Sequence, residues 1–138
     1  MQFSLSSLNL NSIFPILITA LIIYVMLRNI IINRIKEESP LQIISHSYVP
    51  GYVYVDVREQ EEYYKGHIAR SVNIPLSKFK HSFRNIPNDK IVIVICKNGN
   101  RSKKAISFLK DNGYDKLISL KGGTEAWAKA GYPLEYGV

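Results

Sequence analysis

The stretch "IVIVICKNGNRS", Ile91 to Ser102, decides the fold prediction. Its first five residues are β-branched, which is typical of a strand buried on both faces of a parallel sheet. Cys96 is the only cysteine in the chain; it ends this strand, and a loop containing Gly99 leads to a helix that starts at Arg101. Binding sites in such sheets form where a strand's carboxyl end passes into a helix. The stretch therefore predicts an α/β fold with Cys96 at its functional edge.

Strand-like and helix-like segments alternate on both sides of this stretch, which favours one α/β domain with a mostly parallel sheet. Further strands are predicted over 52–57, 71–75 and 116–120, and helices over 39–47, 59–66, 76–85, 101–113 and 122–131. Ser39 is the expected N-cap of the first of these helices, with Pro40 at its first position and Gln42 closing a capping box. Residues 33–38 are interpreted as a short charged linker.

A nearly uncharged N-terminal segment precedes the predicted domain. The run from Ile13 to Leu27 is almost wholly apolar on all faces, and its neighbours extend it to about residues 10–30, long enough to cross a bilayer. A signal peptide or a buried core helix is the alternative. We therefore expect a transmembrane anchor over residues 1–34, partnered by the lipid bilayer, and a separate domain over residues 35–138.

The charges beside the apolar run predict its orientation. Arg28, Arg34 and Lys36 follow the run, and no Lys or Arg precedes it. By the positive-inside rule the N-terminus should lie outside and the domain in the cytoplasm, as a single-pass protein of the inner membrane. The net charge of +7 is spread over the domain without a recognition motif, so nucleic acid is not an expected partner.

The loop after Cys96 has the features of an anion cradle. Backbone amides of a short Gly-containing loop converge on anions, and the following helix N-terminus reinforces them. Lys97 and Arg101 add positive charge, which favours a thiolate over a neutral thiol. A free cysteine at a strand end is otherwise more often a small buried hydrophobe. The glycine, the two basic residues and the helix together favour a nucleophile.

Three motifs in order resemble the single-domain rhodaneses, the thiosulfate sulfurtransferases. They are "CKNGNRS" from Cys96, "VDVREQEEYYKGHIARSVNIP" from Val55 and "LKGGTEAWAKAGYPLE" from Leu120, and the likeness spans about residues 39–136. One position departs from the pattern, because Arg70 stands where the family usually has glycine. The resemblance implies a rhodanese-like domain with a mostly parallel five-stranded sheet flanked by helices.

The resemblance also implies roles for individual residues. Cys96 would take sulfur from a small anionic donor as a persulfide and pass it to cyanide or a thiol, including a protein thiol. Asp56 and Arg58 would order a neighbouring loop, and His67 would be structural. No cofactor and no metal are implied. The residues expected to bind substrate are Lys97, Asn98, Gly99, Asn100, Arg101 and Ser102.

Two other functions compete with sulfur transfer. Phosphatases and arsenate reductases of related fold also use Cys…Arg loops, but the four residues between Cys96 and Arg101 match the sulfurtransferase loop, whereas related phosphatases have five. A membrane-tethered binding or regulatory module without catalysis is the other alternative. The presence of both Cys96 and Arg101 argues against it.

Overall fold

A computed structural model describes residues 10–32 and 34–138. The chain divides into two compact units, with the boundary after Arg34. The first unit is described by one helix, α1 (Leu10–Ile32), with Pro15 near its start. None of the residues Asn11–Ile31 is buried, and the segment is long and apolar enough to cross a membrane, by length and composition alone. A signal sequence passes the same test.

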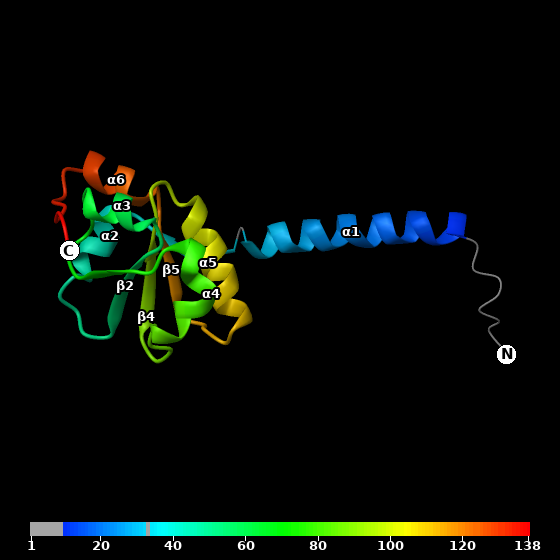
Figure 1. The fold of residues 1–138 in the computed structure, drawn as a ribbon, viewed down its shortest axis with the longest axis horizontal. Helices are drawn as coiled ribbons and strands as arrows, with labels where there is room; N and C mark the ends of the chain where they lie inside the picture. The colour runs from blue at the N-terminus through cyan, green and yellow to red at the C-terminus, as the bar shows by residue number, and fades with distance from the viewer. Residues whose placement is uncertain (1–9, 33) are drawn as a thin grey trace. The chain divides into compact units, whose positions relative to one another are not determined.

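The second unit is built around a five-stranded parallel sheet, as predicted (Figure 1). The strand order is β1-β5-β4-β2-β3. The strands are β1 (Glu37–Glu38), β2 (Tyr52–Asp56), β3 (Ser71–Asn73), β4 (Ile91–Ile95) and β5 (Leu117–Leu120). The helices are α2 (Pro40–Ser45), α3 (Gln60–Tyr64), η2 (Leu76–Lys78), α4 (Phe79–Ser82), η3 (Phe83–Asn85), α5 (Asn100–Asp111) and α6 (Gly123–Lys129).

One row of residues shows how the parallel strands align. Pairing places Glu37, Ser119, Val94, Val55 and Val72 side by side across the five strands. All carboxyl ends of the strands therefore lie on one side of the sheet and all amino ends on the other.

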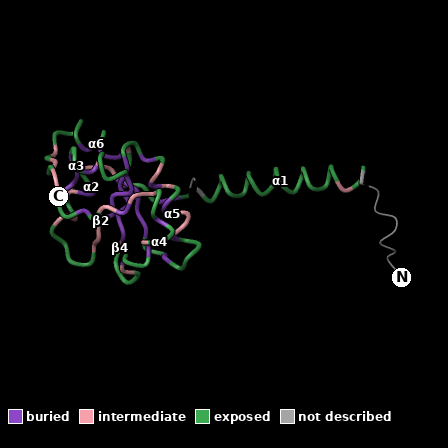
Figure 2. The backbone as a smooth tube through the Cα atoms, viewed as in Figure 1, coloured by how far each residue is buried: buried purple, intermediate pink, exposed green. Residues whose placement is uncertain are grey.

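Helices cover both faces of the sheet, which is why the central strand β4 is apolar throughout. α5 contacts β4 and β5 on one face (Figure 1). On the other face α6 contacts β5, and Ile43 of α2 packs in the same core cluster. Ile93 and Ile95 on β4 are completely buried, and Trp127 of α6 packs in the same cluster. Figure 2 shows this burial concentrated in the strands. Trp127 thus serves the core, and its indole N–H donates to the Pro133 carbonyl at 3.0 Å.

Two segments differ from the sequence predictions. Glu37 and Glu38, interpreted as linker, form β1 on the edge of the sheet, because backbone pairing with β5 overrides their weak strand propensity. The single helix expected over 76–85 is instead three short turns, η2, α4 and η3. The capping box of Ser39 and Gln42 on α2 is confirmed, as is Pro40 at the start of the helix.

The burial of β4 generates a stability prediction for residues 35–138. Ile93→Ala should lower the free energy of unfolding by about 2–5 kcal/mol, because it removes a fully buried side chain and leaves a cavity. Chemical denaturation measures the change. Leu41→Ala removes an isomeric side chain that is 69% exposed and should cost less than about 0.5 kcal/mol. Equal losses in the two variants would contradict the assigned core.

Candidate functional site

Cys96 lies at the carboxyl end of β4, directly before the loop that leads into α5. The residue is completely buried. The loop folds back over it, so that the Gly99 amide donates to the Cys96 Sγ at 3.0 Å. Gly99 has φ of 98°, a left-handed conformation that glycine adopts without strain. An amide donating to sulfur stabilises a negatively charged sulfur more than a neutral one.

The start of α6 holds the first peptide groups of the loop. The Thr124 amide donates to the Cys96 carbonyl at 2.8 Å, and the Glu125 amide donates to the Lys97 carbonyl at 3.1 Å. Gly123 makes this approach possible, since a Cβ atom there would lie 2.3 Å from the Cys96 carbonyl oxygen. The Gly-Gly sequence therefore has a packing function within the site.

Two side chains hold the far part of the loop. The buried Ser102 hydroxyl donates to the Gly99 carbonyl at 2.9 Å and lies 2.7 Å from the Ser119 hydroxyl of β5. Because Ser102 has one hydroxyl proton, Ser119 is then the donor of the second bond. The Asn100 amide donates to the Asn98 side-chain oxygen at 3.2 Å. The predicted contact of Ser102 with substrate stays a prediction, whereas its support of the loop is visible.

Arg101 forms a two-pronged ion pair with a carboxylate from another element. Its two terminal nitrogens each lie 2.7 Å from a Glu62 carboxylate oxygen on α3. The hydrogen bond from Arg101 lowers the pKa of Glu62 to about 2, against an ordinary value of 4.5. The same bond raises the pKa of Arg101 above its ordinary value. The predicted binding of a donor by Arg101 stays a prediction, and the structure gives this guanidinium a carboxylate partner.

Asp56 and Arg58 form a buried ion pair beside the loop. The Arg58 side chain contacts the Asp56 carboxylate at 2.8–3.1 Å and donates to the Gly66 carbonyl at 2.7 Å. It also reaches the Glu62 carbonyl at 3.4 Å. Asn73 donates to the Arg58 carbonyl at 2.8 Å. The pair therefore fixes the backbone that carries Glu62.

His67 has a structural environment. Its ring stacks on Tyr63 with centroids 3.8 Å apart, and its Nδ1 lies 2.9 Å from the Tyr63 carbonyl oxygen. A carbonyl accepts only, so Nδ1 carries the proton. The backbones of His67 and Glu135 form two hydrogen bonds, in which each amide donates to the other residue's carbonyl at 2.8 Å. These contacts tie the C-terminal segment to the domain.

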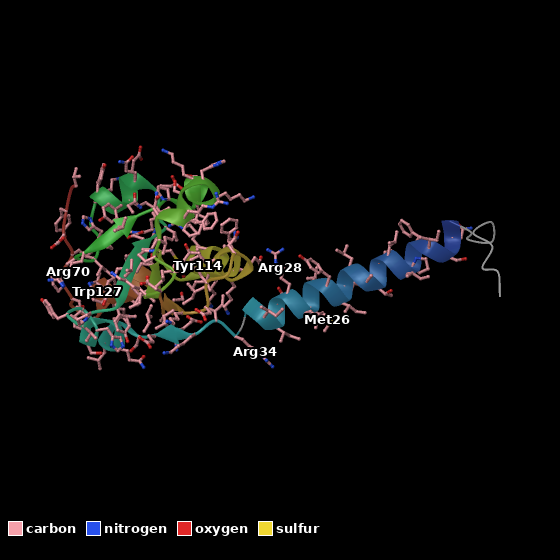
Figure 3. The ribbon with its side chains drawn as sticks, turned by 90° about the horizontal axis from the view of Figure 1, so that it is seen from below. Met26, Arg28, Arg34, Arg70, Tyr114 and Trp127 are labelled. Carbon is pink, nitrogen blue, oxygen red and sulfur yellow. The ribbon has the colours of Figure 1, made fainter. Side chains whose placement is uncertain are left out.

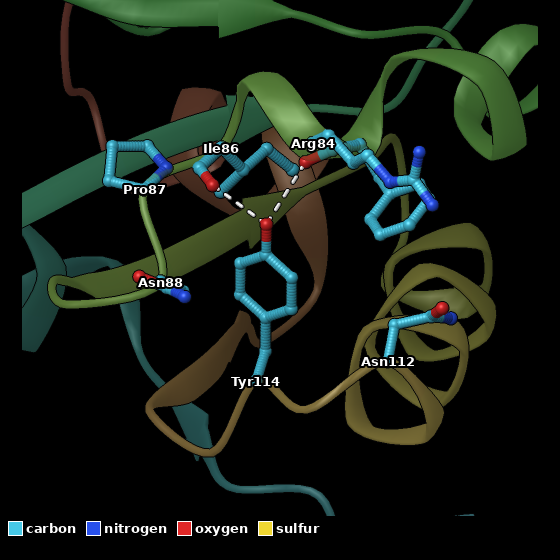
Figure 4. Close-up of a pocket in the computed structure, with 7 residues that line it drawn as sticks. Arg84, Ile86, Pro87, Asn88, Asn112 and Tyr114 are labelled. Carbon is cyan, nitrogen blue, oxygen red and sulfur yellow. Dashed lines mark hydrogen bonds between the residues drawn. The ribbon is translucent and has the colours of Figure 1, made fainter.

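A hollow of about 320 Å³ borders the cysteine loop. Glu62, Lys97 and Thr124 lie in its wall, which connects α3, the loop and α6. A second hollow of about 450 Å³ lies at the far end of α5, where the Tyr114 hydroxyl contacts the carbonyls of Phe83 and Ile86 (Figure 4). Among residues 10–32 and 34–138, no cluster of three or more His, Cys, Asp or Glu side chains could hold a metal ion.

Sequence reasoning did not assign Glu62 or Ser119 to this site. Glu62 lies 39 residues before Arg101 and pairs with it only because β2, α3 and β4 meet at the carboxyl side of the sheet. Ser119 is a polar residue between apolar neighbours in "LISL", Leu117 to Leu120, and that interruption was a usable signal. A polar side chain buried in an inner strand of a sheet needs a hydrogen-bond partner.

Comparison with known proteins identifies relatives of this domain. Residues 42–130 match the family model of the rhodanese-like domain. A sulfurtransferase of Allochromatium vinosum is 31% identical over 103 residues, covering 75% of this chain and 94% of the relative. The thiosulfate sulfurtransferase GlpE of Pseudomonas entomophila is also 31% identical, with 75% and 93% covered. These relatives support a function of the sulfurtransferase type.

A solved structure gives the same fold. The rhodanese-related protein of Thermoplasma volcanium is 33% identical, with a TM-score of 0.67 over 72% of this chain and 97% of that one. That protein and the two sulfurtransferases consist of little more than the matched domain.

The ion pair of Glu62 and Arg101 generates a prediction on acid stability. Glu62→Gln should lower the free energy of unfolding near pH 7 by up to about 1 kcal/mol, a modest value because the pair is partly exposed. The Glu62 pKa is depressed in the folded state, so its stabilisation is complete above about pH 4.5 and is lost as pH falls to about 2. The difference between wild type and variant should therefore shrink over that range.

Chemical denaturation of residues 35–138 at a series of pH values measures this difference. Glu61→Gln on the same helix is the matched control, because Glu61 is exposed and its substitution causes the same change in net charge. A Glu62→Gln effect that persists undiminished at pH 2 would contradict the assigned pair.

Proposed function

The chain belongs to the rhodanese-like domain family, and from that premise we propose that it transfers sulfane sulfur from a thiosulfate-like donor to a thiophilic acceptor. The observation that carries the proposal is the position of Cys96, at the carboxyl end of β4 with the Gly99 amide on its sulfur. A persulfide on Cys96 is the intermediate in this proposal.

The proposed reaction consists of two displacements. The Cys96 thiolate attacks the outer sulfur of the donor, a sulfur–sulfur bond forms on Cys96, and the donor's own sulfur–sulfur bond breaks to release sulfite. A thiolate or cyanide acceptor then attacks the outer sulfur and restores the Cys96 thiolate. This is covalent catalysis with ping-pong kinetics. It needs no general base, because the attacking group is already an anion.

Backbone amides of the loop supply the proposed anion recognition. The Gly99 amide already donates to sulfur, and the two exposed residues before it, Lys97 and Asn98, form the outer part of the loop. The hollow beside Lys97 and Thr124 offers space for an acceptor next to the loop. The loop's length argues against the phosphatase alternative, since a tetrahedral phosphate requires a wider ring than four intervening residues provide.

We further propose that α1 anchors the domain to the inner membrane, with the domain in the cytoplasm. The exposure and apolar composition of Asn11–Ile31 support a membrane span. Arg28, near the C-terminal end of this span, and Arg34, after it, support the orientation. A single-pass span would keep the only cysteine in a reducing compartment.

The Cys96 mechanism predicts a persulfide that mass spectrometry detects. Residues 35–138 exposed to thiosulfate should gain the mass of one sulfur atom, and should transfer that sulfur to cyanide in a turnover assay. Cys96→Ser should gain no sulfur and lose turnover to the uncatalysed background, because a hydroxyl cannot hold transferable sulfur. The mass of the unexposed protein and a thermal melt of the variant are the controls.

The same preparation distinguishes the alternatives. A Cys96→Ser protein with wild-type turnover would contradict the proposed persulfide mechanism. Cys96-dependent hydrolysis of an aryl phosphate would favour the phosphatase alternative. Folded wild-type protein without sulfur uptake or turnover would favour the binding module.

The proposed topology predicts the labelling pattern of the sole cysteine in the full chain. In intact cells a membrane-impermeant thiol reagent should leave Cys96 unlabelled, because the domain is inside. Denaturation after opening the membrane should expose the buried thiol to the same reagent. Alkaline washing should not release the protein. Labelling under denaturing conditions serves as the positive control, and a chain extracted by washing would contradict the anchor.

Labelling in sealed cells tests the orientation only if the buried thiol is accessible. A Val138→Cys variant provides that control, because Val138 is fully exposed at the end of the domain. Protection of the introduced thiol until the membrane is opened would support the cytoplasmic location. Its labelling in sealed cells would show the reverse orientation.

A further inference from the structure

A surface patch on the amino side of the sheet has no part in the proposed reaction. Tyr48, Val49, Arg70, Val72 and Lys90 form it, around a hollow of about 510 Å³, and are called the Tyr48 patch. Of the described residues that line this hollow, two are cationic and none is acidic. The patch is therefore suited to an anionic partner.

Arg70 holds an unfavourable backbone conformation in this patch. Its φ of 65° is the only positive value of a non-glycine residue in the described part of the chain. Its guanidinium donates to the Ser47 carbonyl at 3.3 Å and lies 5.2 Å from the Tyr48 ring centre. Figure 3 labels Arg70 at the surface of the domain. Strain of this kind at an exposed site points to function, because glycine would fit without strain.

The apolar members of the Tyr48 patch are exposed to solvent. Tyr48 is 84% exposed, Val49 48% and Val72 54%. Tyrosine and aliphatic side chains beside lysine and arginine are the combination found where proteins meet the headgroup region of membranes. Cations in such a setting are attracted to anionic headgroups.

The Tyr48 patch lies on the same side of the sheet as Ile35, where the domain begins, so a flat partner surface could contact that side. Ile35 and Arg70 each lie two residues before the row that contains Glu37 and Val72, so both are on the amino side of the sheet. Ile35 precedes the edge strand β1 and Arg70 precedes the edge strand β3, and these two strands are four strand spacings or about 19 Å apart. Cys96 lies on the opposite, carboxyl side. A surface against the amino side would leave the cysteine loop uncovered.

We propose that the Tyr48 patch binds the surface of an anionic lipid bilayer. Tyr48 and Val49 rest at the boundary between headgroups and acyl chains, and Arg70 and Lys90 contact lipid phosphates. The chain's own apolar helix α1, a candidate span, supports lipid as the partner. The proposal does not depend on sulfur transfer, and it concerns residues 35–138 alone.

Vesicle co-sedimentation of residues 35–138 tests the proposal, without the anchor. The domain should bind phosphatidylglycerol–phosphatidylcholine vesicles and should not bind phosphatidylcholine vesicles. Arg70→Gly should weaken binding about five-fold, the loss expected for one cation near an anionic membrane. Its melting temperature should stay unchanged or rise, because glycine relieves the positive φ. Tyr48→Ser should also weaken binding several-fold.

Lys104→Ala is the matched control, because Lys104 is exposed on α5 and its loss makes the same change in net charge. It should change binding less than two-fold. Failure to bind anionic vesicles would overturn the proposal, and so would an equal loss in the Lys104 variant, which would indicate diffuse charge. Full displacement from vesicles by excess glycerol 3-phosphate or by a soluble acidic peptide would also overturn it.

Discussion

The close approach of α6 to the peptide group of Cys96 is the constraint on which the site depends. The amides of Thr124 and Glu125 take up the first two carbonyls of the loop. This contact requires a residue without a side chain at Gly123, whose φ is 62° and whose Cβ would overlap the Cys96 carbonyl oxygen. With its first carbonyls fixed, the loop turns back at Gly99, and an amide reaches the sulfur. The cysteine is thus positioned by a distant helix as well as by its own strand.

A second constraint reaches the loop from the other side. The ion pair of Asp56 and Arg58 is almost fully removed from solvent, which is costly unless every polar atom has a partner. Arg58 meets that condition by donating to backbone carbonyls at Gly66 and Glu62 as well as to the carboxylate. The cost of burial is offset by a fixed backbone around α3. That backbone presents the Glu62 carboxylate to Arg101.

Local patterns predicted the parts of the structure that local forces determine. The β-branched run of β4, the capping box of α2 and the apolar spacing of α5 each follow from neighbouring residues, and all three are present. β1 was missed because two glutamates form a strand only through pairing with β5. The pair of Glu62 and Arg101 was missed for the same reason, since it joins residues distant in sequence. The motif resemblance placed Glu62 in a signature without indicating its contact.

The net positive charge around the cysteine loop is smaller in the folded protein than the loop's own sequence suggests, because carboxylates from other elements lie beside its basic side chains. No acidic residue lies between Cys96 and Lys110, yet Arg101 is paired with Glu62, and Lys97 lies 3.8 Å from Glu125. Both carboxylates come from helices that flank the loop. Opposite charges at such distances cancel much of each other's field at longer range. In the proposed reaction, short-range donors such as the Gly99 amide therefore carry more of the anion's stabilisation than the two basic side chains do. A loop built this way depends on its backbone geometry, and so on Gly123 and Ser102, more than on its net charge.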